Sequence, residues 1–143
     1  MRIRSLLTPE MEVVSLPTTA SVLDATRLMV ETHRGSVLVT GEGDEPAGIF
    51  TERDLMVRVI AKGLTPAEVT LGEVMTVDLY TVPPDRHVTN VRREMRERHI
   101  RHVPVIDSGR VLAVLSVRDL MRADLEETRH DAEALREYIQ GEG

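Results

Sequence analysis

Apolar and polar positions follow a helical spacing in some segments of this chain and a strand pattern in others. Val22, Ala25 and Met29 recur at the spacing of one helix face. The nearly continuous apolar run 36–40, which is bounded by turn residues, is typical of a buried strand. The first half of the chain therefore predicts the order strand, helix, strand, strand, helix. These elements are expected at 13–15, 21–35, 36–40, 47–51 and 52–62.

The same order of patterns returns in the second half of the chain. Pro83 and Pro84 end its first predicted strand, and the turn residues 107–109 separate the other two strands. Each half thus combines three strands with helices on one face, which is an α+β arrangement. The elements of the second half are expected at 79–82, 88–99, 102–106, 111–116 and from 117 onward.

The two halves share residues as well as patterns. Thr51–Met56 and Ser116–Met121 lie 65 residues apart, and each consists of a hydroxyl residue, one variable position and then Arg-Asp-Leu-Met. At an offset of 66 the match continues upstream, for example from His33 to His99. An internal repeat of this kind indicates a pseudo-symmetric pair of halves. Because each half, at roughly 60 residues, would be marginally stable alone, we expect the two to share one core.

Composition excludes several classes of protein. The chain has 143 residues and a net charge of −6, which disfavours non-specific binding to nucleic acid. It contains no cysteine, so disulfides and thiolate metal sites are excluded. The longest uninterrupted apolar run, 111–115, is far shorter than a membrane span, and residues 1–7 lack the apolar segment of a secretory signal. We therefore expect a cytoplasmic protein without membrane contact.

The hydroxyl residue and the acid of each repeated cluster have two explanations. Thr51 with Asp54, and Ser116 with Asp119, match the capping box, in which both side chains bond to backbone amides at a helix start. Capping does not explain why an arginine recurs beside the acid in both halves. A helix start also suits phosphate, and arginine makes bidentate contacts to phosphate oxygens, while a carboxylate accepts hydrogen bonds from a ribose diol. The clusters therefore also fit a nucleotide.

Five segments together carry a resemblance to a known family. They are Val13–Pro17 and Gly48–Leu55 in the first half, and Leu79–Pro83, His99–Asp107 and Val114–Leu120 in the second. Over about residues 5–123 the chain is similar to a tandem pair of CBS domains (cystathionine β-synthase motifs), the arrangement called a Bateman module. The resemblance implies two pseudo-symmetric βαββα modules packed through their sheets, at 1–66 and 67–123, followed by an acidic helical extension at 124–143.

The resemblance also implies a function. Members of this family commonly bind AMP, ADP or ATP in clefts between the two modules and act as energy-sensing regulators, not as enzymes. By this resemblance an adenine nucleotide is a regulatory ligand of the chain, and no cofactor is required. Asp54 and Asp119 would hold ribose hydroxyls, while Arg53 and Arg118 would face phosphate. The other residues that the resemblance places at the nucleotide are Ser15, Ser36, Val37, Thr51, Thr81, His102, Val103, Pro104 and Ser116.

The two halves differ at positions that bear on such sites. Ala113 stands where the family usually has glycine, whereas the first half keeps Gly48. Leu38 takes the place of the proline at 104, and residues 34–36 differ from their counterparts in the second half. We therefore expect the two nucleotide sites to be unequal.

The last predicted helix continues beyond the repeat with apolar residues spaced four and three apart. Such a heptad seam must bury itself against something, and we expect a second subunit in a homodimer. The chain's own surface and an unidentified protein partner are the alternatives. Seven acidic residues and two arginines give residues 124–143 a net charge of −5. The seam residues are Met121, Leu125, Thr128, Ala132, Leu135 and Ile139.

Three further interpretations stay open from the sequence. One is a ligand-free structural or interaction module, in which both acids serve only as caps. Another is nucleic-acid binding by the arginines between 92 and 101, although interleaved glutamates favour a solvated helix face. Metal binding by His99 and His102 is disfavoured, because a site needs three or four ligands and no obvious further ligand completes it.

Overall fold

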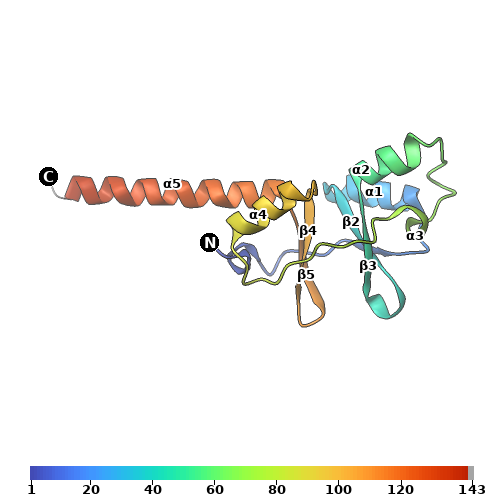
Figure 1. Ribbon diagram of the computed structural model, residues 1–143, viewed down its shortest axis with the longest axis horizontal. Coiled ribbons are helices and arrows are strands. Elements are labelled where there is room, and N and C mark those ends of the chain that lie inside the picture. Colours follow the sequence, from blue (N-terminus) through green and yellow to red (C-terminus); the bar gives the residue numbers. More distant parts are fainter. Residues whose placement is uncertain (142–143) are drawn as a thin grey trace. The chain divides into compact units, whose positions relative to one another are not determined.

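The computed structural model describes residues 1–141 of the chain (Figure 1). They form two compact units, one made of residues 12–80 and one made of residues 1–11 together with the chain from 81 onward. In this division residues 67–80 belong to the first unit and the first eleven residues to the second, whereas the boundary expected from the sequence lies between residues 66 and 67. The last two residues of the expected extension at 124–143 lie outside the described part.

The first unit contains a three-stranded sheet of β1 (Ser15–Pro17), β2 (Ser36–Thr40) and β3 (Pro46–Thr51). β2 lies in the centre, parallel to β1 and antiparallel to β3. Four consecutive residues of β2 are buried, which is why its sequence reads as a continuous apolar run. Helix α1 (Val22–Thr32) contacts β2, and a short 3₁₀ turn, η2 (Glu42–Asp44), joins β2 to β3.

After β3 the chain turns directly into helix. α2 (Glu52–Asp54) continues as a π-helix, η3 (Leu55–Ile60), so the helix expected over 52–62 is present but is wider than an α-helix in its second part. A loop then leads to α3 (Leu71–Val74). From there the chain returns to the sheet, where Thr76 forms a β-bridge with the middle of β3.

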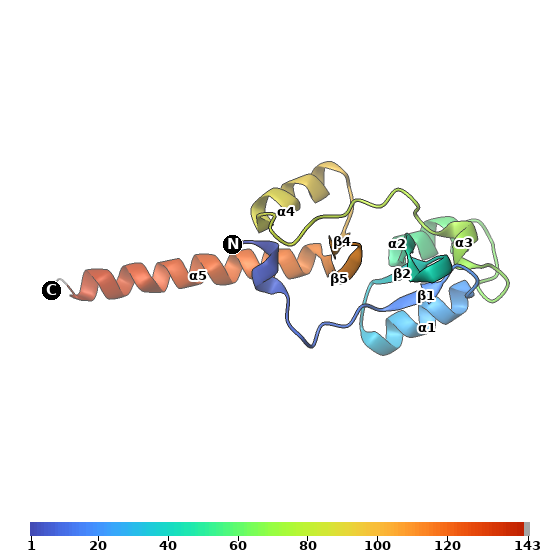
Figure 2. The same ribbon diagram turned by 90° about the horizontal axis from the view of Figure 1, so that it is seen from below.

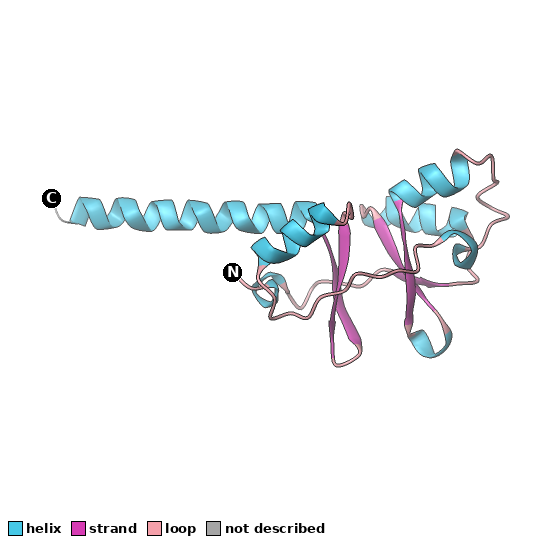
Figure 3. Ribbon diagram, in the orientation of Figure 1, coloured by secondary structure: helices cyan, strands magenta, loops and turns pink. Residues whose placement is uncertain are grey.

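The second unit contains β4 (His102–Asp107) and β5 (Arg110–Ser116), which pair as an antiparallel hairpin (Figure 3). Helix α4 (Val88–Glu97) contacts α5 (Val117–Gly141), and α5 runs well past α4 (Figure 2). A short 3₁₀ helix near the N-terminus, η1 (Ile3–Leu6), also belongs to this unit. No helix within residues 1–141 is both long enough and apolar enough to cross a membrane.

The strand expected at 79–82 is reduced to a single bridge, so that prediction is wrong in extent. The Val82 amide donates to the Pro104 carbonyl (3.1 Å), and the Val82 carbonyl accepts from Ile106 (2.9 Å). Pro83 and Pro84 follow at once and have no N–H group to continue the ladder. Within the described chain, the sheet of the second unit therefore consists of a hairpin plus one bridged residue.

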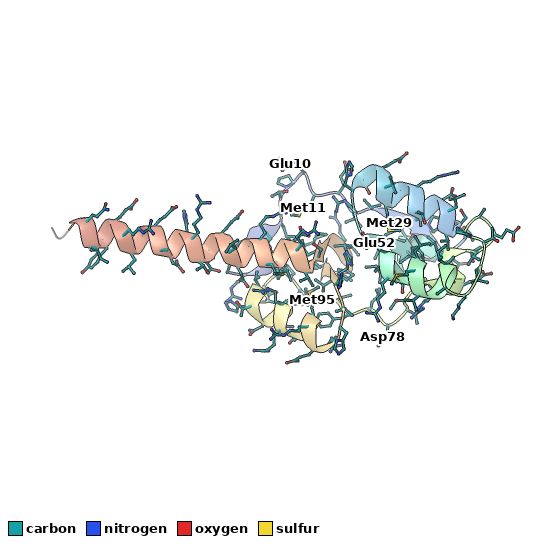
Figure 4. All side chains as sticks on the ribbon, turned by 90° about the horizontal axis from the view of Figure 1, so that it is seen from above. Glu10, Met11, Met29, Glu52, Asp78 and Met95 are labelled. Atoms are coloured by element: carbon teal, nitrogen blue, oxygen red, sulfur yellow. The ribbon has the colours of Figure 1, made fainter. Side chains whose placement is uncertain are left out.

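The repeat is present in the backbone as well as in the sequence. His33 and His99, 66 residues apart, both adopt a left-handed backbone with a φ of 55° near the end of α1 and α4. The helix predicted over 21–35 therefore ends before His33 and not at Gly35, because His33 turns the chain. Met29 and Met95, at matching places in the repeat, are both buried (Figure 4).

Candidate functional site

Both repeated clusters lie at the start of a helix and form capping boxes. In the first unit the Asp54 amide donates to Thr51 Oγ1 (3.2 Å), and the Thr51 amide donates to Asp54 Oδ2 (3.0 Å). In the second unit the corresponding distances between Asp119 and Ser116 are 3.1 Å and 2.8 Å. Each hydroxyl and one oxygen of each carboxylate therefore satisfy backbone amides. A ligand must bind to the polar groups that remain.

Asp54 has little hydrogen-bonding capacity left. The residue is only 7% exposed. Thr76 Oγ1 lies 3.1 Å from Oδ1 and 3.3 Å from Oδ2, and donates its hydrogen bond to this carboxylate. Arg58 Nε lies 3.5 Å from Oδ1. Both oxygens of Asp54 are thus engaged inside the first unit.

Asp119 is in the opposite situation. The residue is half-buried, and Oδ2 accepts the hydrogen bond from the Ser116 amide. Within residues 1–141 no protein group donates a hydrogen bond to its Oδ1. The position that matches Arg58 in the repeat is Ala123, which is buried and has no charge to pair with the acid. The second unit therefore presents an open carboxylate oxygen at the first turn of α5.

Two segments close the two units in the same way, and we call them the first closing segment (69–76) and the second closing segment (1–8). Each donates and accepts backbone hydrogen bonds at matching places of its own unit. The amide-to-carbonyl bonds run from Val22 to Val69 and from Leu71 to Ala20 in the first unit, and from Val88 to Met1 and from Ile3 to Arg86 in the second. By this correspondence, Thr8 is the counterpart of Thr76.

Only one of these two threonines reaches the carboxylate of its unit. The first closing segment approaches β3 closely at Gly48, where a Cβ atom would lie 2.7 Å from the Thr76 carbonyl oxygen. In the second unit the matching position is Ala113, which carries that Cβ atom. Thr8 is exposed and makes no described hydrogen bond to Asp119. The Cβ atom of Ala113 is thus a difference between the two units at the place where, in the first unit, the closing segment approaches the strand closely.

The other predicted residues of the second unit lie along β4 or near the start of α5. His102 pairs with Ser116 in the β4–β5 ladder, and Arg118 is exposed in the first turn of α5. Val103 and Pro104 are buried, so they offer a ligand only backbone groups. The Pro104 carbonyl already accepts from Val82 (3.1 Å), which leaves less of this edge for a base than the sequence suggests. Thr81, the remaining predicted residue of this unit, is exposed.

The predicted residues of the first unit lie around a carboxylate that is already satisfied. Ser36 pairs with Thr51 across β2 and β3 and is only 7% exposed. Val37 is fully buried in the core. Ser15, on β1, and Arg53, in the first turn of α2, are exposed. The structure therefore brings most of these residues to one end of the sheet without leaving the acid free.

The arginine-rich region is partly neutralised by acids of its own unit. Arg92 on α4 forms an ion pair with Asp124 on α5. Arg86 pairs with Glu94 at 2.7 Å. These pairs support the interpretation of a solvated helix face. Within residues 1–141, no group of three or more acidic or histidine side chains is arranged to hold a metal ion.

Two residues that decide the state of Asp54 are not part of the motif read from the sequence. Arg58 follows Asp54 by four positions, which is the spacing of neighbours on a helix and was a usable signal. Thr76 lies outside the repeat as aligned from residue 15 onward. Its match with Thr8 becomes visible when Leu-Leu-Thr at 6–8 is set beside Val-Met-Thr at 74–76.

Each of the two repeats of this chain matches the same known domain family. The family model for the CBS domain matches residues 3–61 and 71–126. The CBS domain-containing protein CBSX3, mitochondrial, of Arabidopsis thaliana is 34% identical over 125 residues, which are 85% of this chain and 61% of that protein. The chain thus spans less than two thirds of the length of this relative. The name of this relative gives a mitochondrial location, so the cytoplasmic location expected above for this chain stays a prediction.

Solved structures with the same fold include proteins of this family. A CBS-domain containing protein from Agrobacterium tumefaciens has a TM-score of 0.80 and 27% identity, covering 86% of this chain and 92% of that one. A CBS domain protein from Pyrobaculum aerophilum, complexed with AMP, has a TM-score of 0.76 and 30% identity, covering 89% of this chain and 97% of that one.

Proposed function

Because the chain belongs to the CBS-domain family and contains two copies of that domain, we propose that it is a regulatory module that binds an adenosine nucleotide and catalyses no reaction. The related protein from Pyrobaculum aerophilum, which was solved with AMP, supports this class of ligand. The curated relative CBSX3 likewise carries a CBS-domain name and no enzyme name.

The open oxygen of Asp119 is the observation that carries the proposal. It lies at the start of a 25-residue helix, where free amides and the helix dipole favour an anion. In this proposal Arg118, which is exposed in the same turn, would contact phosphate, and Oδ1 of Asp119 would accept from a ribose hydroxyl. Capping uses only Oδ2, so the cap and the ligand do not compete for the same atom.

The two halves are not equivalent in this proposal. A nucleotide that used Asp54 would first have to displace Thr76 Oγ1 and the Arg58 guanidinium from the carboxylate. Asp119 requires no such exchange. We therefore assign the stronger nucleotide site to the second unit, with Ser116, Arg118 and Asp119 as its central residues.

Regulation would follow from binding one state of the chain better than another. A ligand shifts a conformational equilibrium only by the difference in its affinity for the two states. We propose that the nucleotide favours one arrangement of the two CBS modules, and that a partner reads this arrangement. The finer assignment to energy sensing depends on which of AMP, ADP and ATP binds best.

Titration calorimetry with ATP, AMP and 2′,3′-dideoxy-ATP tests the assignment. The unmodified chain should bind ATP more tightly than the dideoxy compound, because Asp119 accepts from the ribose hydroxyls. Asp119→Asn should remove that discrimination and weaken ATP binding by about tenfold or more, the loss expected for a hydrogen bond to a charged group. Asp54→Asn, the matched control, should leave the affinity of this site nearly unchanged.

Thermal unfolding without nucleotide separates binding from capping, since Asp119→Asn also alters a cap. A loss of affinity much larger than any loss of stability supports the ligand role. Absence of binding by any adenine nucleotide at millimolar concentration would overturn the proposal. So would binding that is equally strong for ATP and its dideoxy analogue, since Asp119 would then not hold the ribose.

A further inference from the structure

The outer part of α5 is exposed on all sides. Every described residue from Thr128 onward is exposed, and Figure 4 shows side chains standing out around this part of the helix. The exposed residues of α5 include large apolar side chains: Leu125 is 71%, Leu135 59% and Ile139 61% exposed. A helical segment of this length is marginal in water unless an amphipathic face packs against something. The described chain supplies no such packing beyond Glu127.

The exposed apolar residues form one continuous seam. Leu125, Ala132 and Ile139 follow one another at intervals of seven residues. Thr128 lies three positions after Leu125, and Leu135 lies three positions after Ala132. They occupy the a and d positions of a left-handed coiled coil. The outer end of the seam pairs a β-branched Ile at a with Leu at d, the combination that favours two-stranded coils. The weaker centre at Thr128 and Ala132 predicts a reversible association.

Charged residues flank this seam in a fixed order. The e positions are all arginine (Arg122, Arg129 and Arg136). Of the g positions, Asp124 and Asp131 are acidic and Tyr138 is uncharged. In a parallel pair of identical helices, each g residue faces the e residue of the partner helix, which brings opposite charges together. In an antiparallel pair, e faces e and g faces g, which sets arginine against arginine and aspartate against aspartate. The pattern is therefore complementary to itself in the parallel orientation only.

We infer that two copies of this chain associate through α5 as a parallel, in-register coiled coil over residues 125–139. The main charge contact is Asp131 with the partner's Arg136, which the two-fold symmetry repeats. Asp124 contributes less, because Arg92 of its own chain already pairs with it. The acidic balance of residues 124–143, a net charge of −5, disfavours an anionic membrane surface as the alternative occupant of the seam.

Disulfide trapping tests the orientation, and the absence of cysteine from the chain makes the experiment clean. Leu135→Cys places a thiol at a d position, where the two parallel helices are close enough for a disulfide. Glu137→Cys, two residues away on the outer face, is the matched control. Under mild oxidation we expect Leu135→Cys to give a covalent dimer and Glu137→Cys to give little.

Charge reversal measured by sedimentation equilibrium is a second, independent test. Asp131→Arg alone sets like charges opposite each other at two symmetric places and should weaken the dimer by about tenfold. The double substitution Asp131→Arg with Arg136→Asp restores opposite charges in the parallel pair and should recover most of the affinity. Both positions are exposed, so circular dichroism should show that each variant remains folded.

Three outcomes would overturn the inference. One is a chain that is monomeric at all accessible concentrations. Another is a dimer in which Leu135→Cys does not cross-link more than Glu137→Cys, since the copies would then meet elsewhere. The third is a double charge variant that dimerises no better than Asp131→Arg alone, which would exclude the parallel contact.

Discussion

Asp54 and Asp119 hold the same place in the repeat and cap their helices in the same way, but they face different partners. Thr76 Oγ1 and the Arg58 guanidinium satisfy the carboxylate of Asp54 within its own unit. Hydrogen bonds to charged groups contribute about 1.5–3 kcal/mol, so a ligand competing for Asp54 must replace that stabilisation. A ligand that binds Oδ1 of Asp119 has no such hydrogen bonds to replace. One motif therefore produces a structural acid in the first half and an available acid in the second.

The hydroxyl of Thr76 can be removed with little change in shape. We expect Thr76→Val to lower the free energy of unfolding by about 1–3 kcal/mol, because the buried carboxylate of Asp54 loses a donor. Thr76→Ser keeps the hydroxyl and should cost much less. Urea denaturation of the two variants measures the difference. Equal losses would show that the methyl group of Thr76, and not its hydrogen bond, stabilises the unit.

The capping part of the candidate site could be predicted from the sequence because it is local. Thr51 and Asp54 are three positions apart, and a helix start places their side chains and amides together wherever it occurs. The partner that decides whether Asp54 is free, Thr76, lies 22 positions away. Its contact depends on how a later segment returns to the sheet, and no spacing rule contains that information.

At the scale of elements, hydrophobic periodicity located most helices and strands but not their limits. The strand expected at 79–82 is reduced to a bridge at Val82, and the two prolines that follow have no N–H group to continue the ladder past it. α1 ends early because His33, not glycine, takes the left-handed conformation. The π-helical turns of 55–60 have the same apolar spacing as an α-helix to within a residue, so the pattern could not distinguish them.

The methyl group by which Ala113 of β5 differs from Gly48 of β3 has a testable consequence. Gly48→Ala would place a Cβ atom 2.7 Å from the Thr76 carbonyl, so the first closing segment must move away from β3. We expect a loss of about 1–3 kcal/mol in unfolding free energy, typical of overpacking. The Thr76 hydrogen bond to Asp54 should weaken at the same time.

Ala113→Gly is the reciprocal substitution, because it removes the corresponding methyl group. It should allow Thr8 to approach Asp119, and nucleotide affinity at Asp119 should fall. Chemical shifts of the Asp54 and Asp119 carboxyl carbons, measured by NMR, report the two changes directly. Carboxyl shifts that stay constant in both variants would show that the methyl group does not control access to the acids.

At the scale of the whole molecule, the two structural units are not two consecutive stretches of the chain, because residues 1–11 belong to the same unit as the residues from 81 onward. The second closing segment comes first in the chain, and the first closing segment lies between the two repeats. A repeat aligned from residue 15 onward therefore describes each unit without the segment that completes it. This is why the boundary at 66 and 67 was expected from the sequence. Backbone hydrogen bonds such as Ile3 to Arg86 (2.8 Å), which join residues far apart in the chain, reveal the division.

Ile3 and Leu71 hold equivalent places in the two closing segments, and both are fully buried. Truncating either to alanine removes about three methyl or methylene groups from a packed core, which costs about 2–5 kcal/mol. The two losses should be similar in size but different in location. Hydrogen exchange followed by mass spectrometry resolves the location, because local opening exposes the amides of one unit before the other.

We expect Ile3→Ala to accelerate exchange in α4, β4 and β5, and to leave β2 and β3 protected. Leu71→Ala should produce the reverse pattern. Each variant is thus the control for the other, since both remove an aliphatic side chain from the same place in a closing segment. If Ile3→Ala loosened β2 and β3 instead, the second closing segment would stabilise the first unit, and the correspondence between Thr8 and Thr76 would fail. If it loosened all strands equally, the two units would unfold as one, and the stability of each candidate nucleotide site would depend on both closing segments.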